Sequence, residues 1–84
     1  MAGHFMHYVY ILQSEKNGNL YKGSTQDLKV RIKKHNNGEV SHTSHERPWN
    51  IVFYATFKNR EKAIMFEKYL KSGSGIAFMK KRLL

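Results

Sequence analysis

The sequence contains no cysteine, and it has only one proline and six acidic residues in 84. Without cysteine the chain forms neither disulfides nor thiolate metal sites, and a reducing cytoplasm is the compartment that we expect. No apolar run approaches the roughly 20 residues that cross a bilayer, so no membrane segment is expected. Residues 1–6 lack the basic start and apolar stretch of a signal peptide. We interpret them as disordered, or as added before a native start at Met6.

The charge is strongly one-sided. Fifteen Lys and Arg residues oppose six Asp and Glu residues, which gives a net charge of +9 at pH 7. Such an excess on a small domain favours an anionic partner, most often the phosphate backbone of a nucleic acid. A structural basic protein of a ribonucleoprotein has the same charge and is an alternative. An anionic membrane surface is disfavoured, because no long basic amphipathic helix with a broad apolar face is present.

Strand signals occur in three places along a chain that we expect to form one domain, residues 1–84. Residues 7–14 are rich in β-branched and aromatic residues. Asn17-Gly18 is a strong hairpin signal, after which the run LYKGS is expected to return as the antiparallel partner. Residues 49–57 form a third strand, whose long apolar run favours a buried central position in the sheet.

Helix signals fill the remaining segments. The first helix is expected to open at the capping-box pattern of residues 24–27 and to end at Asn36-Asn37-Gly38. The second runs from about residue 60 to 71 after a cap at Asn59, and SGSG at 72–75 stops it. A short closing helix follows at 76–84. The predicted fold class is α+β, with a small three-stranded antiparallel sheet flanked by helices in the order β-β-α-β-α-α.

The second helix carries a carboxylate among apolar residues. Its inward stripe has the i, i+3, i+4, i+7 spacing and comprises Ala63, Phe66, Glu67 and Leu70. A carboxylate that faces a core is costly unless it is paired or bound to a metal. Glu67 is therefore either a metal ligand or a rim residue paired with Lys71 one turn further on.

The first helix places Arg31 and His35 four residues apart, so they share one face. That face is expected to look toward the sheet edge, where the pair can bind a phosphate. A solvated basic face is the alternative. In the loop SHTSHE, His42 and His45 have a spacing that suits a metal, but we expect them to be exposed to solvent.

Two tyrosines lie on the hairpin strands. With Asn17-Gly18 as a two-residue turn, Tyr10 lies opposite residue 25, and a closer approach to Tyr21 needs a longer loop or a bulge. Packing with a solvated hydroxyl is the ordinary role of such residues. Gly23, at the junction of strand and helix, lets the backbone approach an anion closely, and Lys22 adds charge beside it.

Taken together, these features resemble the GIY-YIG nuclease superfamily. The resemblance rests on YVY at residues 8–10, YKG at 21–23, the Arg31–His35 pair and Glu67. Within the superfamily, AIMFEKYLKSGSG and RPWNIVFY are similar to the second helix and third strand of a group of small stand-alone bacterial proteins. The likeness extends from His7 to the C-terminus. It implies a three-stranded antiparallel sheet flanked by helices, and metal-dependent cleavage of DNA.

The resemblance also implies catalytic roles for five residues. Tyr10 and Tyr21 match the tyrosines of the two name-giving motifs, Arg31 the phosphate-binding arginine, His35 a histidine found near it in many members, and Glu67 the metal-binding carboxylate. Three features depart from the family pattern. YVY replaces Gly-Ile-Tyr, Lys22 replaces an aliphatic residue, and no asparagine follows Asn59, where many nucleases have one. The alternative is therefore a nucleic-acid-binding module on the same fold with little or no catalysis.

The resemblance implies a metal-dependent DNA endonuclease, and the residue inventory permits such a mechanism. Because Glu67 is the one carboxylate in an inward stripe, we expect a one-metal site, with Mg²⁺ or Mn²⁺ held by Glu67, waters and the substrate phosphate. We expect Arg31 to clamp the phosphate and Tyr10 or Tyr21 to deprotonate the attacking water, assisted by His35. The metal, Arg31 and Lys22 are expected to lower the pKa of that tyrosine.

Contacts with the DNA backbone are expected to come from Lys22, Gly23, Lys29, Lys33 and Lys34, without reading of bases. A domain of this size is expected to have weak specificity, possible structure selectivity, or a partner protein that supplies specificity.

Overall fold

The computed structural model describes residues 6–84, so the interpretation of the first five residues lies outside the described part of the chain. The elements in chain order are β1 (His7–Ser14), β2 (Leu20–Thr25), α1 (Leu28–Asn36), a 3-10 turn (Ser44–Glu46), β3 (Trp49–Phe57), α2 (Arg60–Leu70), α3 (Gly73–Phe78) and a final π-helical turn (Met79–Leu83). The α+β class and the order β-β-α-β-α-α are confirmed. Among the described helices, none is long and apolar enough to cross a bilayer.

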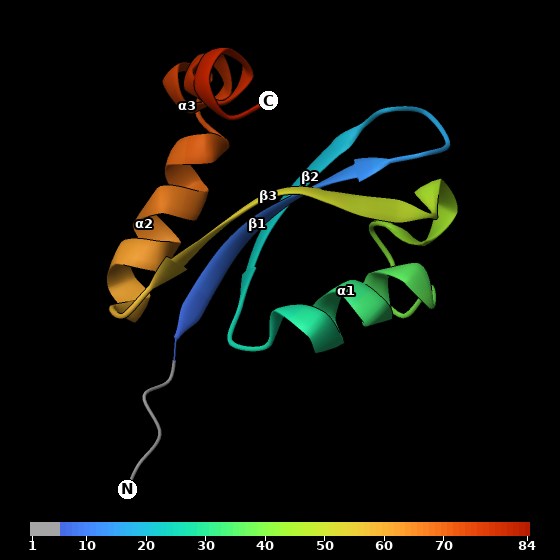
Figure 1. Ribbon diagram of the computed structural model, residues 1–84. Coiled ribbons are helices and arrows are strands. Elements are labelled where there is room, and N and C mark those ends of the chain that lie inside the picture. The colour runs from blue at the N-terminus through green and yellow to red at the C-terminus, as the bar shows by residue number, and fades with distance from the viewer. Residues whose placement is uncertain (1–5) are drawn as a thin grey trace, which may run out of the picture.

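The three strands form one antiparallel sheet in the order β2-β1-β3. Figure 1 shows α1 on one side of this sheet and α2 with α3 on the other. The central strand β1 is therefore covered on both faces, and four consecutive residues, Val9 to Leu12, are at most 1 % exposed. This continuous burial explains why an apolar run occurs where a half-exposed strand would alternate.

The prediction of a central position for the third strand is wrong. β3 is an edge strand, and its apolar residues Ile51 and Tyr54 are 38 % and 55 % exposed. Two of its other residues, Phe53 and Phe57, pack against the core on the α2 side, and Trp49 is buried on the α1 side. An apolar run in one strand does not specify which strand the others pair with, and here both partners pair with β1.

The sheet separates two clusters of buried side chains. On the α2 side the buried cluster comprises Val9, Ile11, Ala63, Leu70 and Met79. On the α1 side it comprises Tyr10, Leu12 and Trp49, and Tyr21, Leu28 and Ile32 pack against it. Tyrosine, tryptophan and histidine side chains concentrate on the α1 side, where polar atoms need hydrogen-bond partners.

The β1–β2 hairpin has a five-residue loop, residues 15–19, in place of the expected two-residue turn. Ser14 N–H donates to the Asn19 carbonyl at 2.9 Å, and Gly18 N–H donates to the Ser14 carbonyl at 2.9 Å. As a result Tyr10 pairs with Gly23, two residues away from the predicted partner. A shift of two residues keeps every side chain on its face, so the core is unchanged while the neighbours of Tyr10 differ.

The helix boundaries follow local capping signals, with two corrections. Asp27, and not Ser24, is the N-cap of α1, and its carboxylate accepts from Val30 N–H at 3.1 Å. The capping-box prediction at 24–27 is wrong because Ser24 and Thr25 still pair in β2. The SGSG segment also begins a helix, since Ser72 caps α3 by accepting from Gly75 N–H. The predicted ends at Gly38 and Asn59 agree with the structure.

Candidate active site

The side chain of Tyr10 extends over β2 at Gly23, a residue that has no side chain. A β-carbon built on Gly23 would lie 2.5 Å from the Tyr10 hydroxyl oxygen and 2.7 Å from Cζ of the ring. Any other residue at this position would displace the ring, because real β-carbons do not approach so closely. Gly23 thus has a steric role beneath Tyr10 that the sequence did not reveal.

A chain of hydrogen bonds extends from Tyr10 into the protein. The Tyr10 hydroxyl lies 2.9 Å from Nε2 of His35, and Nδ1 of His35 lies 2.7 Å from Oγ1 of Thr43. Thr43 Oγ1 in turn donates to the Val40 carbonyl at 3.3 Å. The first three residues are at most 1 % exposed, so the chain is shielded from water.

The directions of these bonds follow from the terminal acceptor. The Val40 carbonyl can only accept, so the Thr43 hydroxyl donates its proton to that carbonyl. Thr43 Oγ1 then accepts a hydrogen bond from Nδ1–H of His35. Nε2 of His35 is then unprotonated and accepts from the Tyr10 hydroxyl. We assign this tautomer because it gives every proton in the chain an acceptor. His35 is therefore poised to take a proton from Tyr10.

The pKa values of the pair keep both groups neutral. Burial, followed by the neighbouring Tyr21, raises the pKa of Tyr10 far above its usual value; Arg31 lowers it and Glu67 raises it. Burial and then the charge of Arg31 lower the pKa of His35. Arg31 lowers the pKa of Tyr10 in the predicted direction, but burial outweighs it, and Lys22 is not among the groups that shift it.

Tyr21 and Arg31 complete this side of the site. The Tyr21 ring centroid lies 5.0 Å from that of His35 and 6.4 Å from that of Tyr10, so the two tyrosines are close, as the longer loop allows. Arg31 is half-buried, and it forms no ion pair with any residue between 6 and 84. A half-buried guanidinium without a carboxylate partner is suited to bind an anion from outside the chain.

Glu67 approaches from the opposite face of the sheet, on the inward side of α2. It is 19 % exposed and pairs with Lys71 Nζ at 2.8 Å, so the predicted rim ion pair is present. Burial alone would raise its pKa, but the hydrogen bond from Lys71, an interaction with the Ser24 hydroxyl and the Lys71 charge lower it. Glu67 is thus ionised at neutral pH and lies next to β2.

Charged and polar groups from both faces of the sheet lie close to Gly23. Ser24 pairs with Val9, so its side chain lies on the α2 side with Glu67, while Tyr10 extends over Gly23 on the α1 side. The Glu67 carboxylate is near enough to raise the pKa of the Tyr10 hydroxyl. The structure therefore brings Tyr10, Tyr21, Arg31, His35 and Glu67 around one short segment of β2.

The donors available for a metal are few. Within residues 6–84 there is no group of three or more His, Asp or Glu side chains that could hold one. Glu67 is an ionised carboxylate, and its partner Lys71 is 52 % exposed and free to swing into solvent. A site with one carboxylate suits Mg²⁺, which retains several waters and also accepts substrate phosphate oxygens. Around this segment of β2, Glu67 is therefore the side chain whose chemistry is compatible with the expected ion.

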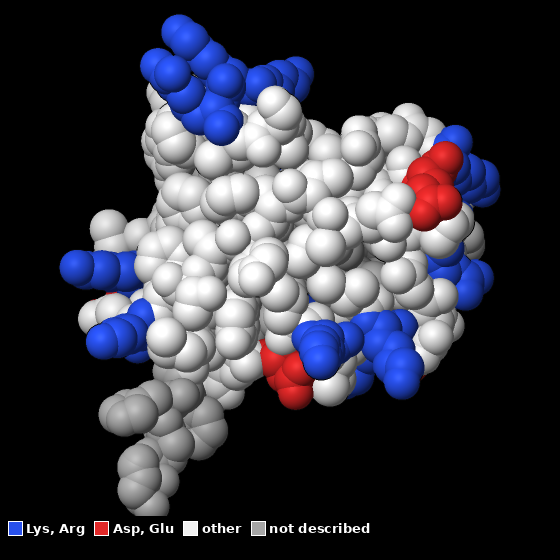
Figure 2. Space-filling view, viewed as in Figure 1, with Lys and Arg blue, Asp and Glu red and all other residues white. Residues whose placement is uncertain are grey.

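The predicted backbone-contact residues lie on β2 and α1, the elements that also carry Tyr21, Arg31 and His35. Lys22 is half-buried, Gly23 is buried beneath Tyr10, and Lys29, Lys33 and Lys34 are exposed along α1. Figure 2 shows Lys and Arg gathered over α1 and at the C-terminal turn, with an uncharged surface over β3 between them. His42 and His45 are both exposed, as expected.

The network also depends on residues that the sequence analysis did not single out as site residues. Trp49 Nε1–H donates to the Thr43 carbonyl at 2.9 Å. Asn36 accepts from Trp49 N–H at 2.6 Å and donates to the Trp49 carbonyl at 3.1 Å. These bonds fix the loop that holds Thr43 against His35. No local sequence pattern indicates a role for Thr43, because its partner His35 lies on a helix eight residues earlier.

Comparisons with known proteins agree with this arrangement. The family model described as the GIY-YIG catalytic domain matches residues 6–81. The chain is 38% identical over 69 residues to a UPF0213 protein of Staphylococcus saprophyticus, covering 81% of this chain and 83% of that one. It is 42% identical over 67 residues to a UPF0213 protein of Clostridium perfringens, covering 79% and 71%. The solution NMR structure of a UPF0213 protein from Bacillus halodurans superposes with a TM-score of 0.57 at 33% identity, covering 90% and 83%.

Proposed function

Because the chain belongs to the GIY-YIG family, whose catalytic domain is that of a nuclease, we propose that it is a metal-dependent DNA endonuclease that hydrolyses phosphodiester bonds with one divalent cation. The observation that carries this proposal is the buried hydrogen bond from the Tyr10 hydroxyl to His35, with Arg31 and Glu67 acting on the same hydroxyl. A phenol directed at a base, beside a free guanidinium and a carboxylate, is the chemistry that phosphodiester hydrolysis needs.

Tyr10, rather than Tyr21, is the group that deprotonates the attacking water, because of the two tyrosines only Tyr10 is hydrogen-bonded to His35. The Tyr10 oxygen takes a proton from water while its own proton passes to Nε2 of His35. The Thr43 hydroxyl holds the other side of the imidazole. Since burial opposes both a free phenolate and a free imidazolium, the transfer is coupled to the attack on phosphorus.

Arg31 binds the scissile phosphate with its planar fork and opposes the charge that develops on it. Glu67 would hold the divalent cation, which would supply Lewis-acid stabilisation of the phosphate and of the leaving oxygen. The exposed lysines of α1, Lys29, Lys33 and Lys34, contact neighbouring phosphates without reading sequence. Specificity then arises from substrate structure or from a partner protein.

A nucleic-acid-binding module without catalysis is the second candidate, and one observation favours it. In this structure the Glu67 carboxylate is already paired with Lys71 at 2.8 Å, so a cation must compete with an ammonium group. If the pair is never broken, Arg31 and the lysines still bind phosphate but no hydrolysis follows. The two candidates differ only in whether DNA is cleaved.

The decisive experiment is a cleavage assay on single-stranded, nicked and branched DNA with Mg²⁺ or Mn²⁺. We expect the wild-type protein to cleave at least one of these substrates, and Glu67→Gln, Arg31→Ala and Tyr10→Phe each to lose about 10²-fold or more in rate. The matched control is Tyr54→Phe, which removes an exposed hydroxyl on β3 and should leave the rate unchanged.

Equal cleavage by wild type and Glu67→Gln would point to a contaminating nuclease and overturn the enzymatic proposal. Binding measured against salt separates the two candidates from a protein that does not bind nucleic acid. For duplex DNA, log K should fall by about 0.9 per phosphate contacted for each unit of log salt. A flat salt response would exclude both candidates.

A further inference from the structure

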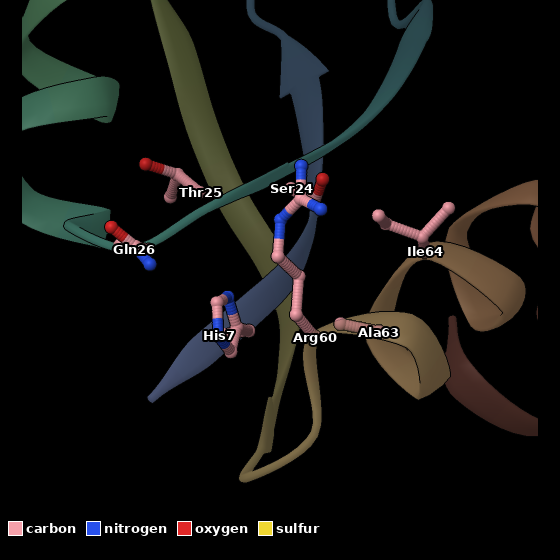
Figure 3. A pocket seen from close by; sticks show the side chains of 7 residues that line it. All are labelled: His7, Ser24, Thr25, Gln26, Arg60, Ala63 and Ile64. Carbon is pink, nitrogen blue, oxygen red and sulfur yellow. The ribbon is translucent and has the colours of Figure 1, made fainter. Parts of the chain in front are cut away.

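A polar pocket lies beside the candidate active site, between the start of β1, the end of β2 and the start of α2. Its volume is about 310 Å³, and its polar lining comprises His7, Ser24, Thr25, Gln26 and Arg60. Figure 3 shows the Arg60 side chain extending from the start of α2 toward Ser24 of β2, with His7 to its left and Gln26 farther to the left. Two apolar residues of α2 complete the wall.

The pocket is rich in donors and has no acidic residue in its lining. Arg60 forms no ion pair with any other residue in the described part of the chain, and it is exposed. Asp27, which follows Gln26, is turned away to cap α1. The Glu67 carboxylate, which interacts with Ser24 of the lining, is itself paired with Lys71. A guanidinium without an ion pair, facing a pocket whose lining has no carboxylate, is matched to an oxyanion.

The pocket is continuous with the active site along β2. Ser24 lines the pocket and also interacts with the Glu67 carboxylate, and its neighbour Gly23 lies under Tyr10. Thr25, at the pocket wall, is two residues beyond Gly23, which is about 6.6 Å along an extended strand. That separation is similar to the spacing of neighbouring phosphates in one nucleic-acid strand.

We propose that this pocket is a second phosphate subsite, in which Arg60 binds the phosphate next to the scissile one on the strand that is cleaved. The inference rests on the proposed function, and it adds a binding position on the α2 side to the one formed by Arg31 on the α1 side. Arg60 binds the phosphate through its fork, while His7 and Gln26 offer further hydrogen bonds. The strand thus crosses β2 near Gly23 and is held at the scissile phosphate by Arg31 and at the neighbouring phosphate by Arg60.

A flanking contact of this kind acts on ground state and transition state alike. Its loss should therefore raise KM and leave kcat unchanged, whereas loss of Arg31 lowers kcat. We expect Arg60→Gln to raise KM by about tenfold and to reduce the salt slope of binding by about 0.9, the value of one phosphate contact. The matched control is Arg82→Gln, which removes an exposed arginine at the C-terminal turn and should change KM by less than about twofold. Equal effects of the two substitutions would overturn the proposal.

A neutral methylphosphonate placed at one linkage of the oligonucleotide tests the contact without any cleavage. Binding is measured in the Glu67→Gln background without metal, moving the neutral linkage one position at a time. The protein that retains Arg60 should bind more weakly when the neutral linkage is adjacent to the cleavage position. The protein with Arg60→Gln should show no such loss of affinity there. If Arg60→Gln retains the same sensitivity at every linkage, the subsite is refuted. A loss of affinity at one linkage that depends on Arg60 would support the phosphate subsite even if the wild-type protein cleaves nothing. In that case the endonuclease proposal fails while the phosphate subsite stands.

Discussion

The hydroxyl oxygen of Tyr10 lies 2.9 Å from Nε2 of His35, a hydrogen bond between the centre of β1 and the last turn of α1 that is fully buried. Because both groups are also packed in the core on the α1 side, the same contact that positions the proposed base holds α1 to the sheet. A change that breaks it should reduce stability and activity together.

Gly23→Ala should break this contact without touching either residue. The new β-carbon would lie 2.5 Å from the Tyr10 hydroxyl, so the ring must move and its hydrogen bond to His35 is lost. We expect a loss of about 1–3 kcal/mol in the free energy of unfolding, from overpacking and the unsatisfied imidazole nitrogen, measured by urea denaturation. Cleavage should fall to the level of Tyr10→Phe.

Gly73→Ala is the matched control for this substitution. Gly73 opens α3, and a β-carbon there meets no atom within 4 Å, so stability should be unchanged or slightly higher. In the double variant Gly23→Ala with Tyr10→Phe, the two losses in cleavage rate should overlap rather than add. Wild-type stability and rate in Gly23→Ala would contradict the close approach of Tyr10.

Thr43 should act as a positioning residue for His35. Thr43→Val keeps the shape but leaves Nδ1–H of His35 without its acceptor at 2.7 Å, and burial of that group should destabilise the protein by about 1–3 kcal/mol. The imidazole ¹⁵N chemical shifts of wild type should report the Nδ1–H tautomer, and those of Thr43→Val should report a loss of that tautomer. We expect kcat to fall with little change in KM. Thr43→Ser, which restores the hydroxyl, should recover the wild-type kcat and the wild-type imidazole ¹⁵N shifts. If Thr43→Val has the wild-type kcat and shifts, Thr43 does not position His35.

Local sequence signals were sufficient to locate the strands and helices. They were insufficient to predict which strands pair and in which register. The strand around Tyr10, the helix with Arg31 and the cap at Asn59 follow from propensity and capping patterns that act within a few residues. The edge position of β3 could not be predicted, because pairing with β1 is decided by contacts across the whole sheet. The hairpin register failed for a related reason: Asn17-Gly18 signals a turn, and Ser14 with Asn19 determines how long the loop is.

The candidate site shows the same limit. Helical spacing predicted that Arg31 and His35 share a face and that Glu67 lies on the inward side of α2, and the structure has them there. Helical spacing did not distinguish a metal ligand from a rim ion pair; the structure shows the ion pair with Lys71, and metal binding by Glu67 stays a prediction. Thr43 was passed over although His42 beside it was considered, because only the folded loop brings its hydroxyl to His35.

Stability should depend on pH through His35. Its pKa in the folded protein is lowered below the ordinary value of 6.5, so between the two values the unfolded chain binds more protons and stability rises with pH. The free energy of unfolding should therefore decrease as the pH falls below about 6.5, and the loss should level off below the folded pKa. Cleavage should lose rate on the same acid side, because an imidazolium cannot accept the Tyr10 proton.

Urea denaturation at several pH values between 5 and 8 tests this linkage. His35→Gln should have a smaller acid-side slope than the wild-type protein, while His42→Gln, a control at an exposed histidine, should keep the wild-type slope. Identical slopes in wild type and His35→Gln would show that His35 does not titrate differently in the folded state.

The Glu67–Lys71 pair should control access of a divalent cation to the site. Lys71→Met removes the ammonium group that lies 2.8 Å from the carboxylate and keeps the apolar stem, so Mn²⁺ should bind several-fold more tightly, and Glu67→Gln should abolish binding. The stability change should stay within about 1 kcal/mol, because the ammonium is half exposed. Paramagnetic broadening of amide NMR signals measures the binding without turnover, and it should centre on Ser24 and Glu67. Lys68→Met, an exposed lysine on the same helix, is the control; broadening equal in the two lysine variants would mean that Lys71 does not compete with the metal.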